Sequence, residues 1–234
     1  ANLQRSILPK AAAFANNEYF ELATKLIPAK DVSGDFYDVF YLDEDKIAVL
    51  IADVSGKGLS AAFFMTMSKI LIKNYCLENP DNPGKVLEKV NKALCMDNKA
   101  QMFVTVSMAI YNFKTGISKY VEAGHHSAIT IKNGKVGKSK KMQSIALGIY
   151  DEAEYKFRNV TINIGDILIF FTDGITEALS PDNKEYGENR LIELISKNKD
   201  KPLNSLCNII IKDVTDFECK KRFDDITLVV FRRL

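Results

Sequence analysis

The sequence contains few of the residues on which several classes of site depend. Histidine occurs only twice, and the four cysteines show no paired metal-ligand spacing: Cys76, Cys95, Cys207 and Cys219. A chain of 234 residues does not need disulfides to hold its core, so we expect a reducing, cytoplasmic setting. No Cys-x5-Arg loop, Gly-rich Walker loop or G-x-S-x-G elbow is present, which argues against chemistry that relies on those motifs.

An excess of charge and long apolar runs are also missing. The 32 basic and 30 acidic residues nearly balance, so nucleic acid is not an expected partner. The longest apolar stretches, residues 47–52 and 167–171, are far shorter than the roughly 20 residues of a bilayer-crossing helix. With 47% hydrophobic residues, the chain is expected to form one globular domain that does not insert into a membrane.

Hydrophobic periodicity predicts mostly strands. Apolar or β-branched runs indicate strands over residues 19–27, 36–42, 47–52, 167–171 and 226–231. Spacing of three and four indicates helices over residues 59–74, 83–94, 189–197 and 203–217. Residues 103–164 are expected to form an antiparallel meander, with a type I′ hairpin at Lys132-Asn133-Gly134-Lys135. We therefore expect an α+β fold of mainly antiparallel sheets with helices packed outside.

Four aspartates occupy the ends of predicted strands. Asp53 and Asp173 follow buried strands, whereas Asp35 and Asp224 come just before strands. In antiparallel neighbours the end of one strand lies beside the beginning of the next, so all four carboxylates can line one edge. An aspartate beside a glycine is usually a turn residue, and only the combination of the four favours a site.

Such a cluster of carboxylates requires cations. Two ionised carboxylates 4 Å apart repel by about 4 kcal/mol at an effective dielectric constant of about 20. Magnesium and manganese favour oxygen ligands, so a divalent metal site is the simplest compensation. Near Asp53 and Asp173 the sequence offers only Lys57 as a basic neighbour. This lysine could pair with a nearby aspartate, contact a substrate phosphate or remain a solvated charge.

Short motifs in a fixed order cover nearly the whole chain: Gln4 with Leu8-Pro9, residues 32–38, residues 53–58 with Ala61-Ala62, Ala123-Gly124-His125, Leu147-Gly148, residues 172–174 with 176–178, Tyr186-Gly187, and residues 224–227. Together they resemble the SpoIIE and RsbU type of serine/threonine phosphatase, a bacterial branch of the metal-dependent protein phosphatase 2C superfamily. Ser33 and His126-Ser127 depart from the usual pattern of the family, which affects loop shape more than metal binding.

The resemblance implies an α-β-β-α sandwich with two Mn²⁺ or Mg²⁺ ions at one edge. Asp53 would bridge the ions, and the Val54 carbonyl would add a ligand. Asp173 and Asp224 would complete the shell of one ion, and Asp35 would act at the other, directly or through water. Two further acids, Asp38 and Asp225, would be supporting or structural residues.

The resemblance also implies a function. The ions would activate a water that hydrolyses phosphoserine or phosphothreonine on a partner protein of the anti-sigma-factor antagonist type. Residues 1–16 would be a linker helix from an upstream sensor or response domain, and residues 17–234 the phosphatase domain, with a homodimer possible. His125 could protonate the leaving group or be structural.

Two other functions fit the same sequence. One is a catalytically silent signalling module that keeps the fold and binds partners. The other is hydrolysis of a small phosphoester by the same metals.

Overall fold

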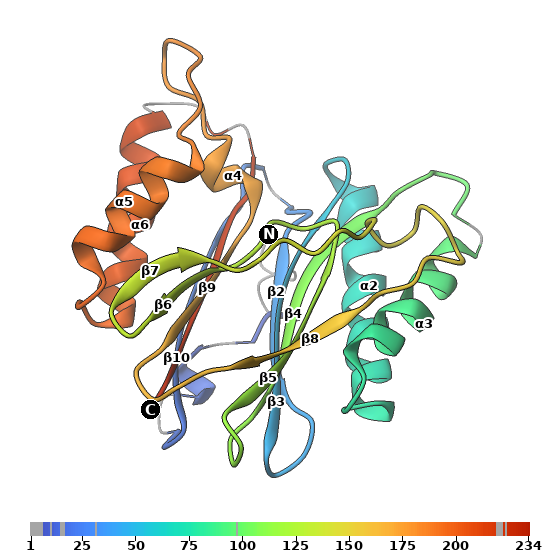
Figure 1. The fold of residues 1–234 in the computed structure, drawn as a ribbon. Coiled ribbons are helices and arrows are strands. Elements are labelled where there is room, and N and C mark those ends of the chain that lie inside the picture. The colour runs from blue at the N-terminus through green and yellow to red at the C-terminus, as the bar shows by residue number, and fades with distance from the viewer. Residues whose placement is uncertain are drawn as a thin grey trace.

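The computed structural model describes residues 7–9, 11–14, 17–30, 32–96, 98–218, 222 and 224–234. Within them, ten strands form two five-stranded antiparallel sheets that pack face to face. One pair of long helices covers the outer face of each sheet, as Figure 1 shows. The α-β-β-α sandwich expected from the resemblance is therefore confirmed.

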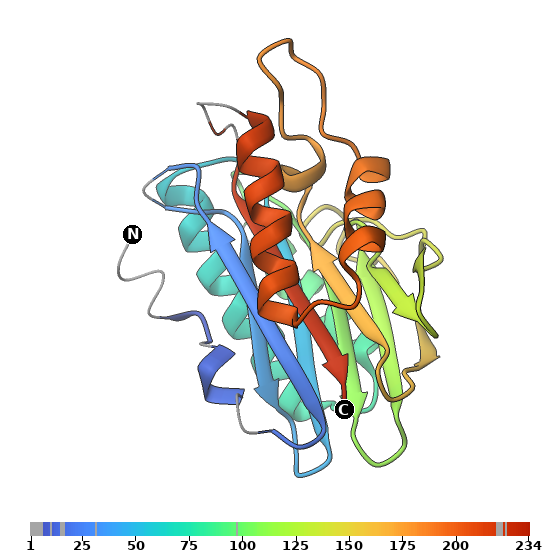
Figure 2. The same ribbon diagram turned by 90° about the vertical axis from the view of Figure 1, so that its left-hand side faces the viewer.

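The first sheet has the order β1-β10-β9-β6-β7 and carries helices α5 and α6 on its outer face, seen face-on in Figure 2. Its strands are β1 (Phe20–Ile27), β10 (Ile226–Arg233), β9 (Ile167–Phe171), β6 (Ile129–Lys132) and β7 (Lys135–Lys138). The helices of this half are α4 (Asp173–Thr176), α5 (Glu188–Asn198) and α6 (Leu203–Glu218). The sequence predicted α5, α6, β9 and β10 to within two residues at each end, whereas it gave no sign of α4.

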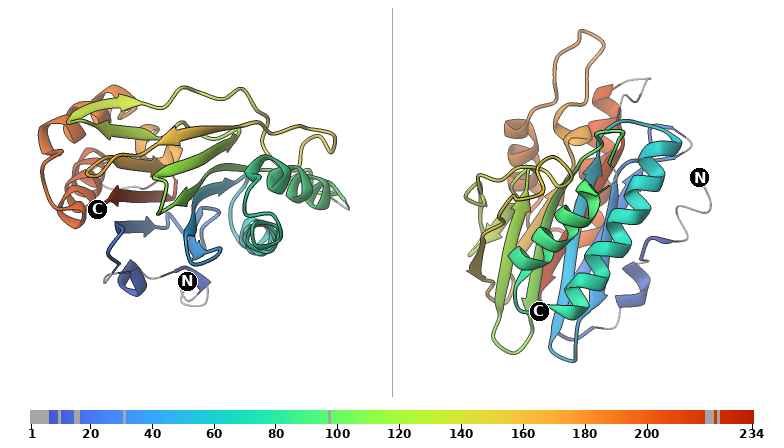
Figure 3. Two further views of the ribbon diagram at one scale, coloured as in Figure 1. Left: turned by 60° about the horizontal axis from the view of Figure 1, so that its bottom comes forward. Right: turned by 90° about the vertical axis from the view of Figure 1, so that its right-hand side faces the viewer.

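The second sheet has the order β2-β3-β4-β5-β8 and is covered by α2 and α3, as the right-hand view of Figure 3 shows. Its strands are β2 (Phe36–Tyr41), β3 (Lys46–Val54), β4 (Val104–Asn112), β5 (Ile117–Ala123) and β8 (Phe157–Thr161). The helices are α2 (Leu59–Glu78) and α3 (Pro83–Cys95). Helix α2 extends one turn beyond its predicted end.

The meander predicted for residues 103–164 is only partly correct. Strands β4, β5 and β8 are neighbours in the second sheet, in the order in which they occur along the chain. The β6–β7 hairpin, which lies between β5 and β8 in the sequence, instead pairs with β9 in the first sheet. The predicted turn between β6 and β7 is confirmed, since Asn133 and Gly134 both have positive φ angles of 48° and 72°. A local turn signal identifies a hairpin but does not specify which sheet the hairpin joins.

Only part of the expected linker over residues 1–16 lies among the described residues, where it forms a 3₁₀ helix, η1 (Ala11–Phe14). Phe14 is buried against Phe20 and Tyr41, and the Tyr37 hydroxyl donates a hydrogen bond to the Pro9 carbonyl at 3.0 Å. These residues therefore pack onto the sandwich. The division into a linker and a phosphatase domain stays a prediction.

Helix α2 has two apolar faces. Phe64 and Met65 are buried against the sheet, whereas Phe63 and Met67 are 67% and 50% exposed. They belong to an exposed apolar stripe along the helix: Leu59, Phe63, Met67, Ile70 and Leu77. No helix in the described part of the chain is both long and apolar enough to span a bilayer.

The core between the sheets depends on side chains that alternate along the central strands. On β9, Leu168 and Phe170 point to the opposite sheet, whereas Ile169 packs toward the helices. Phe231 on β10 has its ring centroid 5.1 Å from that of Tyr111 in the other sheet. Aromatic side chains thus join the two layers directly.

Replacing Phe231 by alanine is expected to lower the free energy of unfolding by about 3–5 kcal/mol, because it opens a cavity between the sheets. Ile164→Ala is the matched control, since that side chain is 75% exposed and its loss should change stability by about 0.5 kcal/mol at most. Urea denaturation of both variants measures the difference. Equal midpoints would contradict this account of the core.

Candidate metal centre

The four aspartates lie where two pairs of antiparallel strands end. Asp35 precedes β2 and Asp53 lies near the end of β3, and these strands pair with Phe36 opposite Ala52. Asp173 follows β9 and Asp224 precedes β10, which pair with Leu228 opposite Phe171. The predicted convergence on one edge of the sandwich is therefore found.

Asp35 bonds the two sheets together at this edge. The hydroxyls of Thr172 and Thr227, both from the first sheet, donate hydrogen bonds to Asp35 Oδ2 at 2.7 and 2.6 Å. The backbone N–H of Thr227 donates to Thr172 Oγ1 at 3.0 Å, which fixes that hydroxyl in turn. Since Asp35 belongs to the second sheet and is only 2% exposed, these contacts fix the position of its carboxylate.

Negative charge accumulates around this carboxylate. Burial raises the pKa of Asp35 well above its usual value, and the nearby charge of Asp53 adds to the effect. Burial likewise raises the pKa of Asp53 to about 7, with a further contribution from Asp173. The pKa of Asp173 is raised by burial and then by Asp224. Asp35, Asp53 and Asp173 are therefore harder to ionise, first because they are buried and then because other acids are close.

One member of the group forms an ion pair with lysine. Lys57 Nζ lies 3.0 Å from Asp224 Oδ2, so this lysine is a partner for an aspartate. Among the described residues, Asp35 and Asp53 form no ion pair with lysine or arginine. A set of oxygen donors with uncompensated negative charge fits a hard divalent cation.

Two glycines allow the backbone segments of the site to approach closely. A Cβ atom on Gly174 would lie 1.9 Å from the Asp225 carbonyl oxygen, and one on Gly34 would lie 2.9 Å from the Val54 carbonyl oxygen. A side chain at either position would force these segments apart. The Gly34 contact also places the Val54 carbonyl beside the loop that carries Asp35.

A family model described as "Stage II sporulation protein E (SpoIIE)" matches residues 43–234, most of the chain. This chain belongs to the SpoIIE family. The resemblance inferred from the ordered motifs is thereby confirmed.

Relatives of the SpoIIE-family chain are similar along its whole length. "Phosphoserine phosphatase RsbU" of Bacillus subtilis (strain 168) is 29% identical over 240 residues, which cover 100% of this chain and 68% of RsbU. "Protein IcfG" of Synechocystis sp. is 27% identical over 257 residues, which cover 99% of this chain and 40% of IcfG. The chain thus spans only part of each relative.

A solved structure confirms the fold. The SiaA-PP2C domain of Pseudomonas aeruginosa superimposes with a TM-score of 0.85 at 20% sequence identity, covering 99% of this chain and 93% of that one. The SpoIIE-family chain therefore has the fold of a PP2C phosphatase domain.

The histidine of the Gly-His motif is structural. His125 is 3% exposed, and its Nε2 lies 3.1 Å from the Phe171 carbonyl oxygen, so Nε2 must donate. Its Nδ1 then accepts from the Thr105 hydroxyl at 2.7 Å. Burial lowers the pKa of His125 to about 3, with a further contribution from His126. A buried neutral ring that joins both sheets is poorly suited to donate a proton to a leaving group.

Asp38 and Asp225 are structural as well. Asp225 accepts hydrogen bonds from the backbone N–H groups of Ala29 and Gly34 at 2.7 and 2.9 Å, which holds the loop before Asp35. Asp38 forms an ion pair with Lys69 of α2 and lies inside the second sheet. Asp38 thus has the contacts of a structural residue, and Asp225 orders the loop that leads to the site.

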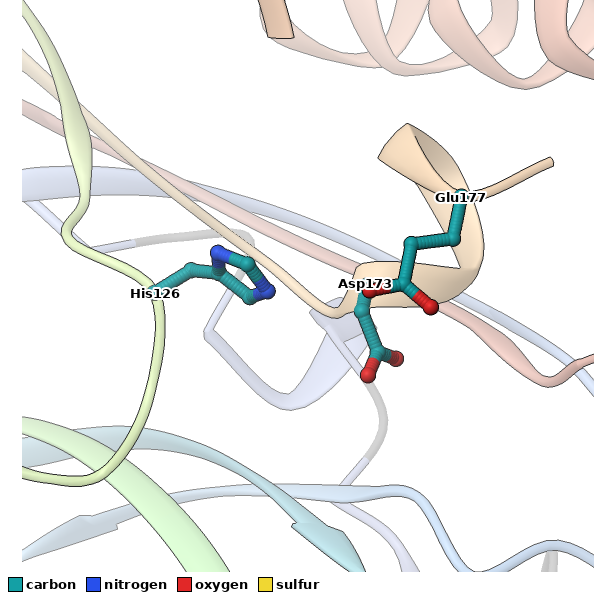
Figure 4. A group of neighbouring side chains, drawn as sticks. All are labelled: His126, Asp173 and Glu177. Carbon is teal, nitrogen blue, oxygen red and sulfur yellow. The ribbon is translucent and has the colours of Figure 1, made fainter. Parts of the chain in front are cut away.

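Sequence analysis missed two residues at this edge, His126 and Glu177. Their ligand atoms and one of Asp173 lie within 4.8 Å of one another (Figure 4). The four predicted aspartates all lie in the described part of the chain. No three of them have ligand atoms within 4.8 Å of one another. Residues four apart lie on one face only if they are helical, and no helix was predicted over Asp173 and Glu177; nothing in the sequence placed His126 beside them either.

The raised pKa of Asp53 makes the metal-free protein sensitive to pH. An acid whose folded-state pKa of about 7 exceeds its ordinary value of 3.8 contributes stability at low pH that is lost as pH rises through 7. With a chelator present, the free energy of unfolding of the wild type should fall from pH 4 to pH 8. Asp53→Asn should flatten this slope in urea titrations. Parallel slopes would contradict the assignment.

His125 should not titrate between pH 5 and pH 8, because its pKa is lowered to about 3. The measurement is the chemical shift of its ring C–H protons by NMR, with His126→Gln used to assign the signals of the two histidines. A midpoint for His125 near the ordinary histidine pKa of about 6.5 would contradict the buried, neutral assignment.

Proposed function

We propose that this chain is a metal-dependent protein serine/threonine phosphatase domain that acts on phosphoserine or phosphothreonine of a bacterial regulatory protein of the anti-sigma-factor antagonist type. The acidic edge formed by Asp35, Asp53, Asp173 and Asp224 carries this proposal. Membership of the SpoIIE family and the similarity to the phosphoserine phosphatase RsbU support it.

The residues at the edge suit two Mn²⁺ or Mg²⁺ ions. In this proposal Asp53, the Val54 carbonyl, Asp173 and Asp224 would hold the ions, and Asp35 would act directly or through water. When bound, two such ions lower the pKa of a water molecule and polarise a phosphoryl group. Threonine hydroxyls hold Asp35, and the close backbone approach at Gly34 holds the Val54 carbonyl, so the ligands are ordered by the fold.

Regulation by an upstream sensor or response domain is part of the proposal. Helix α2 begins five residues after Val54, so its movement would change how Asp53 and Val54 present their oxygens. The exposed apolar stripe of α2 supports contact with another protein surface, in the same chain or in a homodimer. The free thiols of Cys76, Cys95 and Cys207 agree with a reducing cytoplasm, whereas Cys219 lies outside the described residues.

Hydrolysis of a phosphoserine peptide with Mn²⁺ tests the function. Asp53→Ala and Asp173→Ala should each reduce kcat/KM by about a hundredfold or more, because metal polarisation contributes several kcal/mol. Asp200→Ala is the control, since this exposed acid follows α5 and belongs to no proposed ligand set. Release of inorganic phosphate is the measurement.

Two outcomes would favour the other functions. Metal binding without hydrolysis, together with partner binding that survives Asp173→Ala, would indicate a silent signalling module. Faster hydrolysis of a nucleotide than of the phosphopeptide would indicate a small-phosphoester hydrolase.

A further inference from the structure

His126, Asp173 and Glu177 form a compact group of metal-ligating side chains that the proposed two-ion centre does not use in full. His126 lies between β5 and β6, and the two acids come from α4 and its C-cap. Figure 4 shows the imidazole pointing from its loop toward the two carboxylates. One ligand atom of each residue lies within 4.8 Å of the others.

The ligand atoms of His126, Asp173 and Glu177 are too far apart to contact one another directly. Among the described residues, neither carboxylate forms a hydrogen bond or an ion pair within 4.0 Å with His126, so the three side chains do not satisfy one another. A zinc-type ion lies about 2.0–2.2 Å from its nitrogen and oxygen ligands, which separates ligand atoms by at most about 4.4 Å. Small side-chain rotations would therefore close the group around one ion.

The side chains are held in place by the surrounding fold. The His126 ring stacks on Phe171 with a centroid distance of 5.8 Å and an interplanar angle of 23°. The Glu177 N–H donates to the Asp173 carbonyl at 2.7 Å, which keeps both acids on one helical turn. Partial burial and then the charge of Asp173 raise the pKa of Glu177, whereas the nearby His126 lowers it, so the three side chains lie close enough to influence one another electrostatically.

We propose that His126, Asp173 and Glu177 form a separate metal site that selects a first-row transition ion, such as Zn²⁺ or Mn²⁺, over Mg²⁺. The imidazole nitrogen decides this preference, because Mg²⁺ favours oxygen-only shells. Three protein ligands leave positions open for water, and the exposed Glu177 allows exchange with solution. Asp173 has two oxygens and can face both this site and the two-ion centre.

Titration with Co²⁺ alone, followed by its visible absorption, tests the site without any hydrolysis assay. Glu177→Gln and His126→Asn should each weaken one Co²⁺ site by about tenfold or more, since even outer-shell changes cost that much. Glu185→Gln is the matched control, because it removes an exposed carboxylate nearby. This control should bind Co²⁺ as the wild type does.

Two further measurements separate this site from the two-ion centre. Asp53→Asn should retain the site that depends on His126, and a tenfold molar excess of Mg²⁺ over Co²⁺ should leave its spectrum unchanged. Unaltered Co²⁺ binding in both His126→Asn and Glu177→Gln would overturn the inference, as would loss of the site in Asp53→Asn or its displacement by Mg²⁺. Loss of phosphopeptide hydrolysis alone would bear only on the proposed function.

Discussion

The position of the Asp35 carboxylate determines how the two halves of the site meet. It belongs to the second sheet, yet the hydroxyls that bind it, those of Thr172 and Thr227, come from the first. Two hydroxyls from one sheet thus hold one carboxyl group of the other, so this contact aligns the edges of the two sheets. The loop before Asp35 is held in turn by Asp225, from the start of β10.

The same edge is electrostatically unfavourable in the absence of cations. Asp35, Asp53 and Asp173 all have raised pKa values, first because they are buried and then because they repel one another. The aromatic core between the sheets and the cross-sheet bonds of Asp35 and His125 offset this cost. Stability is thus provided by the sandwich, whereas the acidic edge provides the potential to bind metal.

Most elements and the acidic edge could be predicted, because they depend on local patterns. The apolar runs of β3 and β9 and the spacing of α2 and α6 gave their positions, and strand-end aspartates in antiparallel neighbours can share an edge. The sheet joined by β6 and β7 could not be predicted, since hairpin signals do not encode long-range pairing. Helix α4 was missed because four residues are too few for a periodic signal.

The sequence by itself determined the SpoIIE family, the fold class and the four strand-end carboxylates, since ordered motifs and alternating side chains are local properties of the chain. Only the tertiary structure decided the surroundings of the two histidines. His125 is neutral because both sheets surround it, and His126 faces Asp173 and Glu177 because Phe171 holds its ring there. Burial and contact between residues distant in sequence arise only when the layers pack.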